Sequence, residues 1–169
     1  MTDDEETKSI DEVQKETDQQ LKELSKQLNR LGEKFGGFAE SLALPSMTKV
    51  LTERFSMEVI CPSVRVNKQG ERMVIDVLAY ASSDINEAYI VEVRTNASEE
   101  AIERLRNTLE CFRRLFPMHE DKTVYGILAA VDMPDDLRER ILKAGFYVAR
   151  IHDQVFELDV PANFKPRAY

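Results

Sequence analysis

Two apolar runs rich in β-branched residues dominate the middle of the chain, at residues 72–80 and 88–95. They flank a short polar break at residues 82–86. Apolar runs of this length on either side of a turn are typical of a hairpin of two buried strands. The pattern therefore predicts a central hairpin around which the other elements are arranged.

The predicted hairpin carries charged residues inside its apolar strands. If the turn is centred in the polar break, residues whose numbers sum to 168 lie opposite each other, so Asp76 faces Glu92 and Val74 faces Arg94. Because side chains alternate along a strand, Val74, Asp76 and Leu78 then share one face, with Glu92 and Arg94 on the matching face. Like charges placed directly opposite destabilise a sheet, so the two carboxylates require a cation beside them.

The N-terminal segment shows a heptad pattern instead. Its apolar residues are separated by three and four positions in turn: Leu21, Leu24, Leu28, Leu31, Phe35 and Phe38. No glycine or proline precedes Leu31, so the segment is compatible with a helix of about 30 residues, ~45 Å long. Over residues 1–35 we expect a disordered start and then a coiled coil that joins two copies of the chain as a homodimer. The alternative is one amphipathic helix folded back on its own domain, since only about two heptads are fully apolar.

Beyond residue 35 the pattern predicts an alternation of helices and strands. We expect Gly36–Gly37 to interrupt the first helix, and Pro45 either to kink it or to start the next one. The further elements expected are a strand at 59–67, the hairpin, a helix from Ser98 to Pro117, a strand at 123–131, a helix at 134–145 and strands at 146–151 and 155–158. This order predicts an α/β domain over residues 36–160, with a mixed central sheet flanked by helices, and an irregular tail at 161–169.

Composition narrows the range of partners. The chain of 169 residues has a net charge of −8, which argues against a broad basic surface for nucleic acid but is compatible with a local basic groove. Cys61 and Cys111 have no metal-binding spacing, and His119 and His152 are isolated residues that we expect at the surface. No apolar run is long enough to span a membrane, so we expect a cytoplasmic protein without a membrane partner.

Metal binding is one solution to the two opposed carboxylates. Two carboxylates held close on rigid strands suit a hard divalent cation such as Mg²⁺, with water and a phosphate in its remaining positions. Such a metal would polarise a water molecule and stabilise the transition state of phosphodiester hydrolysis. The basic residues on the helix that follows, including Arg104, are either solvated or form a rim that contacts phosphate.

The sequence around the carboxylates resembles the PD-(D/E)XK nuclease superfamily. The resemblance rests on Met73–Val77 and Tyr89–Thr95, and the expected order of elements is similar to the restriction-endonuclease-like core, αβββαβ, with an extra C-terminal helix and strands. Residues 31–40 and 145–148 are most similar to a prokaryotic family in which a coiled coil precedes a nuclease-like domain. The likeness covers most of residues 31–158.

This resemblance implies a metal-dependent nuclease that hydrolyses DNA or RNA. Asp76 and Glu92 would bind Mg²⁺ or Mn²⁺, and Glu40 would be an accessory acid; otherwise Glu40 is a solvated helix position. Arg94 stands where the superfamily has lysine, and in an active enzyme it would contact the phosphate or the attacking water. Arginine also clasps carboxylates, which would exclude the metal. The alternative is a catalytically inactive nuclease-like fold that acts as a coiled-coil-assembled binding or scaffolding module.

Overall fold

The computed structural model describes residues 3–169, and the side chains of all of these except residues 3–11, 28, 29, 32–36 and 38. The chain divides into two compact units, Met1–Gly37 and Phe38–Tyr169. Helix α1 (Asp3–Glu53) supplies the first unit and the beginning of the second.

Helix α1 has no break at Gly36–Gly37 and includes Pro45, so the predicted interruption is wrong. A glycine in a helix interior costs only about 1 kcal/mol relative to alanine, which the neighbouring turns can offset. Pro45 removes one backbone N–H from the helix. On either side of it, however, Ala43 and Met47 are fully buried, and this packing stabilises the helical conformation of the second unit.

The second unit is built on a six-stranded mixed sheet whose strands follow one another in chain order. The strands are β1 (Val59–Lys68), β2 (Glu71–Tyr80), β3 (Glu87–Asn96), β4 (Thr123–Asp132), β5 (Tyr147–His152) and β6 (Val155–Leu158). Pairing is parallel from β3 to β5 and antiparallel elsewhere. The crossovers between the parallel strands contain α2 (Glu99–Leu115) with the short 3-10 helix η1 (Pro117–His119), and α3 (Asp135–Lys143). The predicted α/β architecture with a mixed sheet is confirmed.

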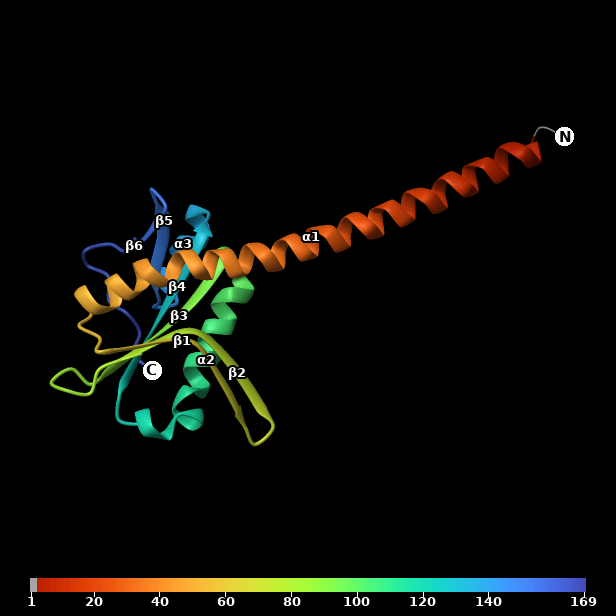
Figure 1. Cartoon of the computed structure of the whole chain (residues 1–169). Helices are drawn as coiled ribbons and strands as arrows, with labels where there is room; N and C mark the ends of the chain where they lie inside the picture. Colours follow the sequence, from red (N-terminus) through yellow and green to blue (C-terminus); the bar gives the residue numbers. More distant parts are fainter. Residues whose placement is uncertain (1–2) are drawn as a thin grey trace. The chain divides into compact units, whose positions relative to one another are not determined.

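Helices cover both faces of this sheet (Figure 1). One face packs against α1 through residues that recur every four positions: Ala39, Ala43, Met47 and Leu51. The other face packs against α2 and α3, mainly through Ile102, Leu105, Leu109, Phe112 and Ile141. Strand β4 contributes Leu128 to one core and Ile127 to the other, as expected of a continuous apolar run.

Strand β2 has different partners along its length. Between Val77 and Tyr80 it pairs with β3 in the predicted register, in which residue numbers sum to 168. The pairing stops at Val77, so Asp76 and Glu92 are not ladder partners, and that part of the prediction is wrong. Beyond this point β2 pairs only with β1, and residues 64–75 form a two-stranded ribbon that extends past the other strands (Figure 1). We call this segment the β1–β2 ribbon.

The side-chain alternation of β2 shifts where the ribbon begins. Ile75 packs on the α2 face with Leu78, whereas Val77 packs on the α1 face. Residues two positions apart share a face in a regular strand, so Asp76 lies at an irregularity. At the same level of β1, Ser63 has a φ of +51°. The predicted common face of Val74, Asp76 and Leu78 assumed a regular strand and is wrong.

The isolated histidines and cysteines differ in their surroundings. His119, which we expected at the surface, is buried against the rings of Tyr80 and Phe112, because the turn of η1 directs it back into the apolar core. His152 is exposed, as predicted. Cys61 and Cys111 are free and partly buried. No helix among the described residues is long and apolar enough to cross a membrane.

The C-terminal residues contain no helix or strand, as predicted, but they are bonded to the sheet. Tyr169 and Val124 exchange two backbone hydrogen bonds, and the backbone N–H of Arg167 donates to the carbonyl of Gly145 at 2.9 Å. Gly145 ends α3 with a φ of +89° and faces the backbone of Arg167 directly. The absence of a side chain at residue 145 therefore makes room for the tail.

We expect Gly145→Ala to lower the free energy of unfolding by about 3 kcal/mol, measured by urea denaturation. A Cβ atom at this position would lie 2.4 Å from Arg167 Cβ and 2.9 Å from its backbone nitrogen, which adds a clash to the backbone strain. Gly70→Ala is the matched control, because Gly70 has a φ of +82° with open space around it and its substitution introduces only about 1 kcal/mol of strain. Equal losses in the two variants would contradict the role of the Arg167 contact.

Candidate functional site

Strand β3 carries Glu92 and Arg94 on the face that α2 covers. The preceding residues of this face, Ala88 and Ile90, are part of the core shared with α2. Glu92 is only 2% exposed and is the only buried carboxylate among the side chains that the structure describes. A buried carboxylate is costly without a countercharge, and the guanidinium Nη2 of Arg94 contacts Glu92 Oε1.

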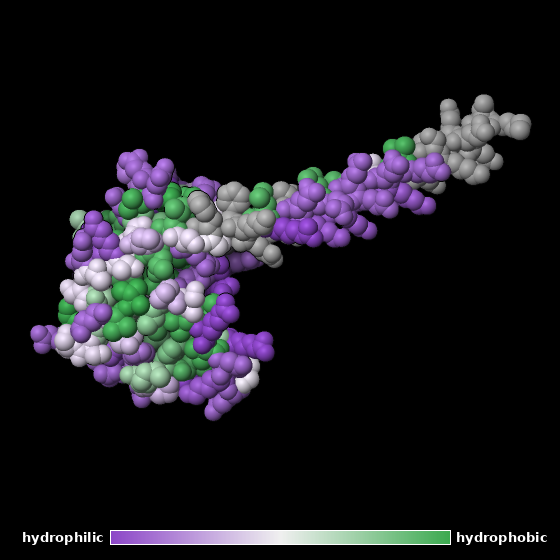
Figure 2. Space-filling view, in the orientation of Figure 1, coloured by the Kyte–Doolittle hydropathy of each residue, from purple (hydrophilic) through white to green (hydrophobic). Residues whose placement is uncertain are grey.

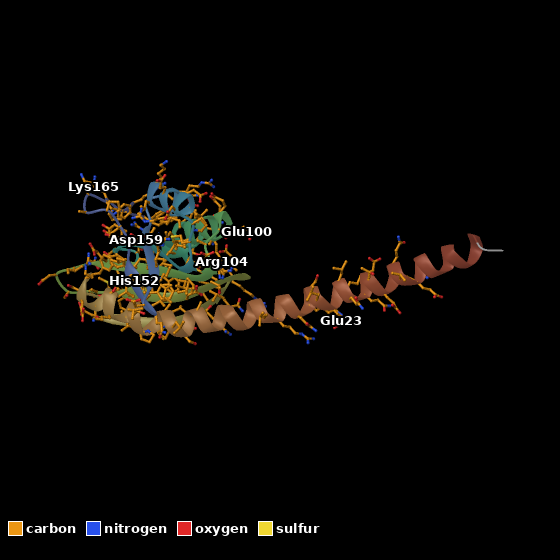
Figure 3. The ribbon with its side chains drawn as sticks, turned by 90° about the horizontal axis from the view of Figure 1, so that it is seen from above. Glu23, Glu100, Arg104, His152, Asp159 and Lys165 are labelled. Atoms are coloured by element: carbon orange, nitrogen blue, oxygen red, sulfur yellow. The ribbon has the colours of Figure 1, made fainter. Side chains whose placement is uncertain are left out.

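Helix α2 supplies a second cation to the same oxygen. The Nε of Arg104 lies 3.2 Å from Glu92 Oε1, while the Arg104 side chain remains 49% exposed. Arg104 stands in the second turn of a helix that begins at the Ser98 cap and carries Glu100 in its first turn (Figure 3). The sequence left Arg104 undecided between a solvated residue and a phosphate-contacting rim. Its position early on the helix that directly follows β3 is the signal that could have placed it at the site.

Asp76 lies beside this group and is held by the backbone of β3. Its Oδ2 accepts a hydrogen bond of 2.7 Å from the backbone N–H of Val93. The ladder between β2 and β3 has ended at this level, so the carboxylate bonds the N–H that a strand partner would otherwise bond. Within the described part of the chain, Asp76 Oδ1 has no hydrogen-bond partner.

The electrostatics of Glu92 show how strained this arrangement is. The pKa of Glu92 is raised to about 7, mainly by burial and also by repulsion from Asp76 and Glu40, against the lowering effect of Arg94 and Arg104. Glu92 Oε1 also accepts no hydrogen bond of good geometry, despite its two arginine contacts. The two strand carboxylates and the two arginines balance in charge, Glu40 adds a further negative charge nearby, and Oε1 of Glu92 lacks a well-directed donor.

Glu40 approaches the same group from helix α1 without joining it closely. Partial burial and repulsion from Asp76 raise the pKa of Glu40, while Arg94 and Arg104 lower it. Its side chain is otherwise exposed. Among the described side chains, no three His, Cys, Asp or Glu residues are placed closely enough to hold a metal ion together.

The residues present fit a divalent cation with two protein ligands. The carboxylate of Glu92 and the available Oδ1 of Asp76 are hard oxygen donors, which Mg²⁺ and Mn²⁺ prefer, while Arg94 and Arg104 contact Oε1 of Glu92. Mg²⁺ is commonly held by one or two carboxylates, with water and phosphate as its other ligands. A cavity of about 590 Å³ lies next to the site between the β1–β2 ribbon and α2, and Arg72, Arg104 and Asn107 are among its lining residues. A polar ligand bound there would contact Arg104 beside Glu92.

The chain resembles some solved structures only distantly. It is 18% identical to an EndoMS–double-stranded DNA complex (TM-score 0.41) over 66% of this chain and 45% of that one. It is 15% identical to a repair endonuclease from Pyrococcus abyssi (TM-score 0.41; 65% and 47%) and 18% identical to EndoMS in its apo form (TM-score 0.38; 63% and 44%). The chain thus spans less than half the length of each. No protein-family model and no curated protein matches it.

We expect the stability of the protein to fall as the pH rises from about 5 to 8. The pKa of Glu92 is about 7 in the folded chain against 4.5 ordinarily, so the folded state binds more protons in this interval and folding is weakened by deprotonation. Glu92→Gln should remove this dependence and be more stable than the parent at pH ~8, by roughly 3 kcal/mol at most.

Thermal unfolding across this pH range measures the effect. Glu139→Gln is the matched control, because Glu139 is an exposed acid of α3 with no ion-pair partner among the described residues. If Glu92→Gln and Glu139→Gln followed the same pH dependence as the parent, burial of a high-pKa carboxylate at residue 92 would be disproved.

Proposed function

We propose that this protein is a metal-dependent phosphodiesterase that hydrolyses nucleic acid at the Asp76–Glu92 site. The observation that carries the proposal is the buried Glu92 carboxylate, which is repelled by Asp76 and paired with Arg94 and Arg104. An arrangement with repelling carboxylates and an unsatisfied oxygen costs stability, and such costs are concentrated at functional sites. The resemblance of the surrounding sequence to the PD-(D/E)XK superfamily supports the same conclusion.

Each residue of the site has a role that follows from its chemistry. Asp76 and Glu92 would hold Mg²⁺ or Mn²⁺, and a metal there supplies a polarised water and offsets negative charge on the phosphate. The hydrogen bond from the Val93 N–H fixes the Asp76 carboxylate, and this also fixes the direction of its other oxygen, Oδ1. Arg94 and Arg104, both partly exposed, would bind the phosphodiester as charge-assisted donors. Glu40 is close enough to influence the site electrostatically and would assist in proton transfer.

A second function is favoured by the contact between Arg94 and Glu92. In this alternative the guanidinium neutralises the carboxylate permanently, no metal binds, and the fold serves as a binding or scaffolding module. The two functions differ in a measurable property, which is the affinity of the site for Mn²⁺. Only the enzyme requires that the metal displace part of the Arg94–Glu92 pair.

Supercoiled plasmid DNA and a single-stranded RNA, each incubated with Mg²⁺ or Mn²⁺, test the activity. We expect cleavage that EDTA abolishes and that Asp76→Asn reduces by about a hundredfold or more, because a metal ligand and its negative charge are lost. Glu139→Gln again serves as the control. Calorimetry with Mn²⁺ complements the assay: if the parent protein neither binds Mn²⁺ nor cleaves, while Arg94→Ala gains Mn²⁺ binding, the scaffold function replaces the nuclease.

We further propose that the first unit joins two copies of the chain through a coiled coil. Along this helix Val13, Leu21, Leu24 and Leu31 are each at least 50% exposed in the single chain. Figure 2 shows hydrophobic side chains at intervals along an otherwise hydrophilic helix surface. The separations between Leu21, Leu24 and Leu31, of three and seven residues, are those of a heptad seam that a second helix of the same kind can cover. A second copy would therefore remove this apolar surface from water.

Light scattering of the full chain tests this dimer. We expect a mass of two chains for the parent and of one chain for the double variant Leu21→Gln and Leu24→Gln, since burial of each leucine contributes about 2 kcal/mol to association. The double variant Lys22→Gln and Glu23→Gln changes two neighbouring positions outside the heptad seam and should remain dimeric. A parent protein of one-chain mass would contradict the proposal.

A further inference from the structure

The arginines of the second unit differ in their partners. On the helices and central strands most arginines are already engaged: Arg94 and Arg104 with Glu92, Arg106 with Glu103, Arg114 with Glu71, Arg138 and Arg150 with Asp159, and Arg140 with Glu99. The β1–β2 ribbon differs. Its Arg65, Lys68 and Arg72 form no ion pair or side-chain hydrogen bond with any described residue. The only acid of the ribbon, Glu71, is neutralised by Arg114 of α2.

The register of the ribbon places its arginines on one exposed face. Asn67 pairs with Arg72, and Arg65 pairs with Val74, so these four side chains point the same way. All four residues are exposed. The alternate residues on the opposite face, Val64, Val66, Met73 and Ile75, pack onto the α2 core. The ribbon is therefore anchored by one face and presents two arginines and an asparagine to solvent on the other.

The ribbon leads along β2 to Asp76 of the proposed site. Strands rise about 3.3 Å per residue, so Val74, opposite Arg65, is about 7 Å and Arg72 about 13 Å along β2 from Asp76. Arg72 also lines the cavity that reaches Arg104 beside Glu92. A chain of net charge −8 repels polyanions in general. The two unneutralised arginines next to the site would instead attract a polyanion locally.

We propose that the exposed face of the β1–β2 ribbon binds duplex DNA by lying in the major groove, with Arg65 and Arg72 contacting phosphates. A two-stranded ribbon fits the major groove of B-form DNA, about 12 Å wide, whereas the major groove of A-form RNA is too narrow to admit it. Asn67, opposite Arg72 and two residues from Arg65 on the same face, would then face the base edges. The inference rests on the proposed function in that it names duplex DNA as the substrate class, with the ribbon positioning it for Asp76 and Glu92.

Fluorescence anisotropy with a labelled DNA duplex of about 20 base pairs tests this inference, with EDTA present so that cleavage does not interfere. Arg65→Ala with Arg72→Ala should weaken binding by about tenfold per arginine, and the slope of log affinity against log salt should fall by about 2. Arg65→Lys with Arg72→Lys keeps the charge and should retain most of the affinity. A duplex RNA of the same sequence should bind more weakly than the DNA.

The matched control removes two cations away from the ribbon. Lys143 and Lys165 are exposed and have no ion-pair partner in the described chain, and Lys165 lies far from Arg104 (Figure 3). If Lys143→Ala with Lys165→Ala weakened binding as much as the ribbon variant, the contact would be unspecific charge attraction and the inference would be overturned.

Three other results would also overturn it: no binding by the parent, equal affinity of the alanine variant, or equal affinity for duplex RNA. Because Arg65 and Arg72 are exposed, the alanine variant should unfold at the parent temperature, which separates loss of binding from loss of fold. Binding that depends on the ribbon but is not followed by cleavage when Mg²⁺ or Mn²⁺ is added would remove the nuclease function and leave the DNA-binding face in place.

Discussion

The hydrogen bond between Asp76 and the backbone of Val93 lies at the point where β2 parts from β3. On one side of it β2 is a regular central strand paired with β3; on the other it leaves the sheet and continues with β1 alone as a ribbon. Where two strands part, backbone N–H groups lose their partners, and each must be bonded elsewhere. A carboxylate that accepts such a bond satisfies the backbone and at the same time brings a negative charge to the point of separation.

The fixed position of the Asp76 carboxylate has a consequence at Glu92. A carboxylate fixed beside β3 by the backbone cannot move away from its neighbour, so the repulsion between Asp76 and Glu92 is built into the fold. Burial also disfavours the charged form of Glu92, and the two arginines offset only part of the combined cost of burial and repulsion. A purely structural solution would replace the group with apolar residues of similar volume, which is often neutral or stabilising. The presence of this strained group is the physical reason to look for its function at the same place.

The elements of the fold could be predicted because their signals are local. The apolar periods, the Ser98 cap and the turns at residues 82–86 and 145 each act over a few residues, and the register from Val77 to Tyr80 follows from the adjacent turn. The departure of β2 from β3 could not be predicted, because it depends on the core beneath Ile75 and on the irregular backbone at Ser63. The role of Arg104 could not be predicted for a similar reason, because its contact with Glu92 forms only when α2 packs against β3.

The charge balance of the site connects these features. Two guanidiniums share one carboxylate oxygen, and with a pKa near 7 Glu92 is protonated in a substantial fraction of molecules at neutral pH. Whenever Glu92 is neutral, the cations of the group outnumber Asp76, and both arginines extend toward solvent. An anion such as a phosphodiester is then attracted, while a divalent cation is favoured when Glu92 is ionised. Arg94 therefore need not act only as a lock on Glu92: as long as Arg104 is present to share the same oxygen, either guanidinium can turn to a phosphate without leaving the buried carboxylate unpaired.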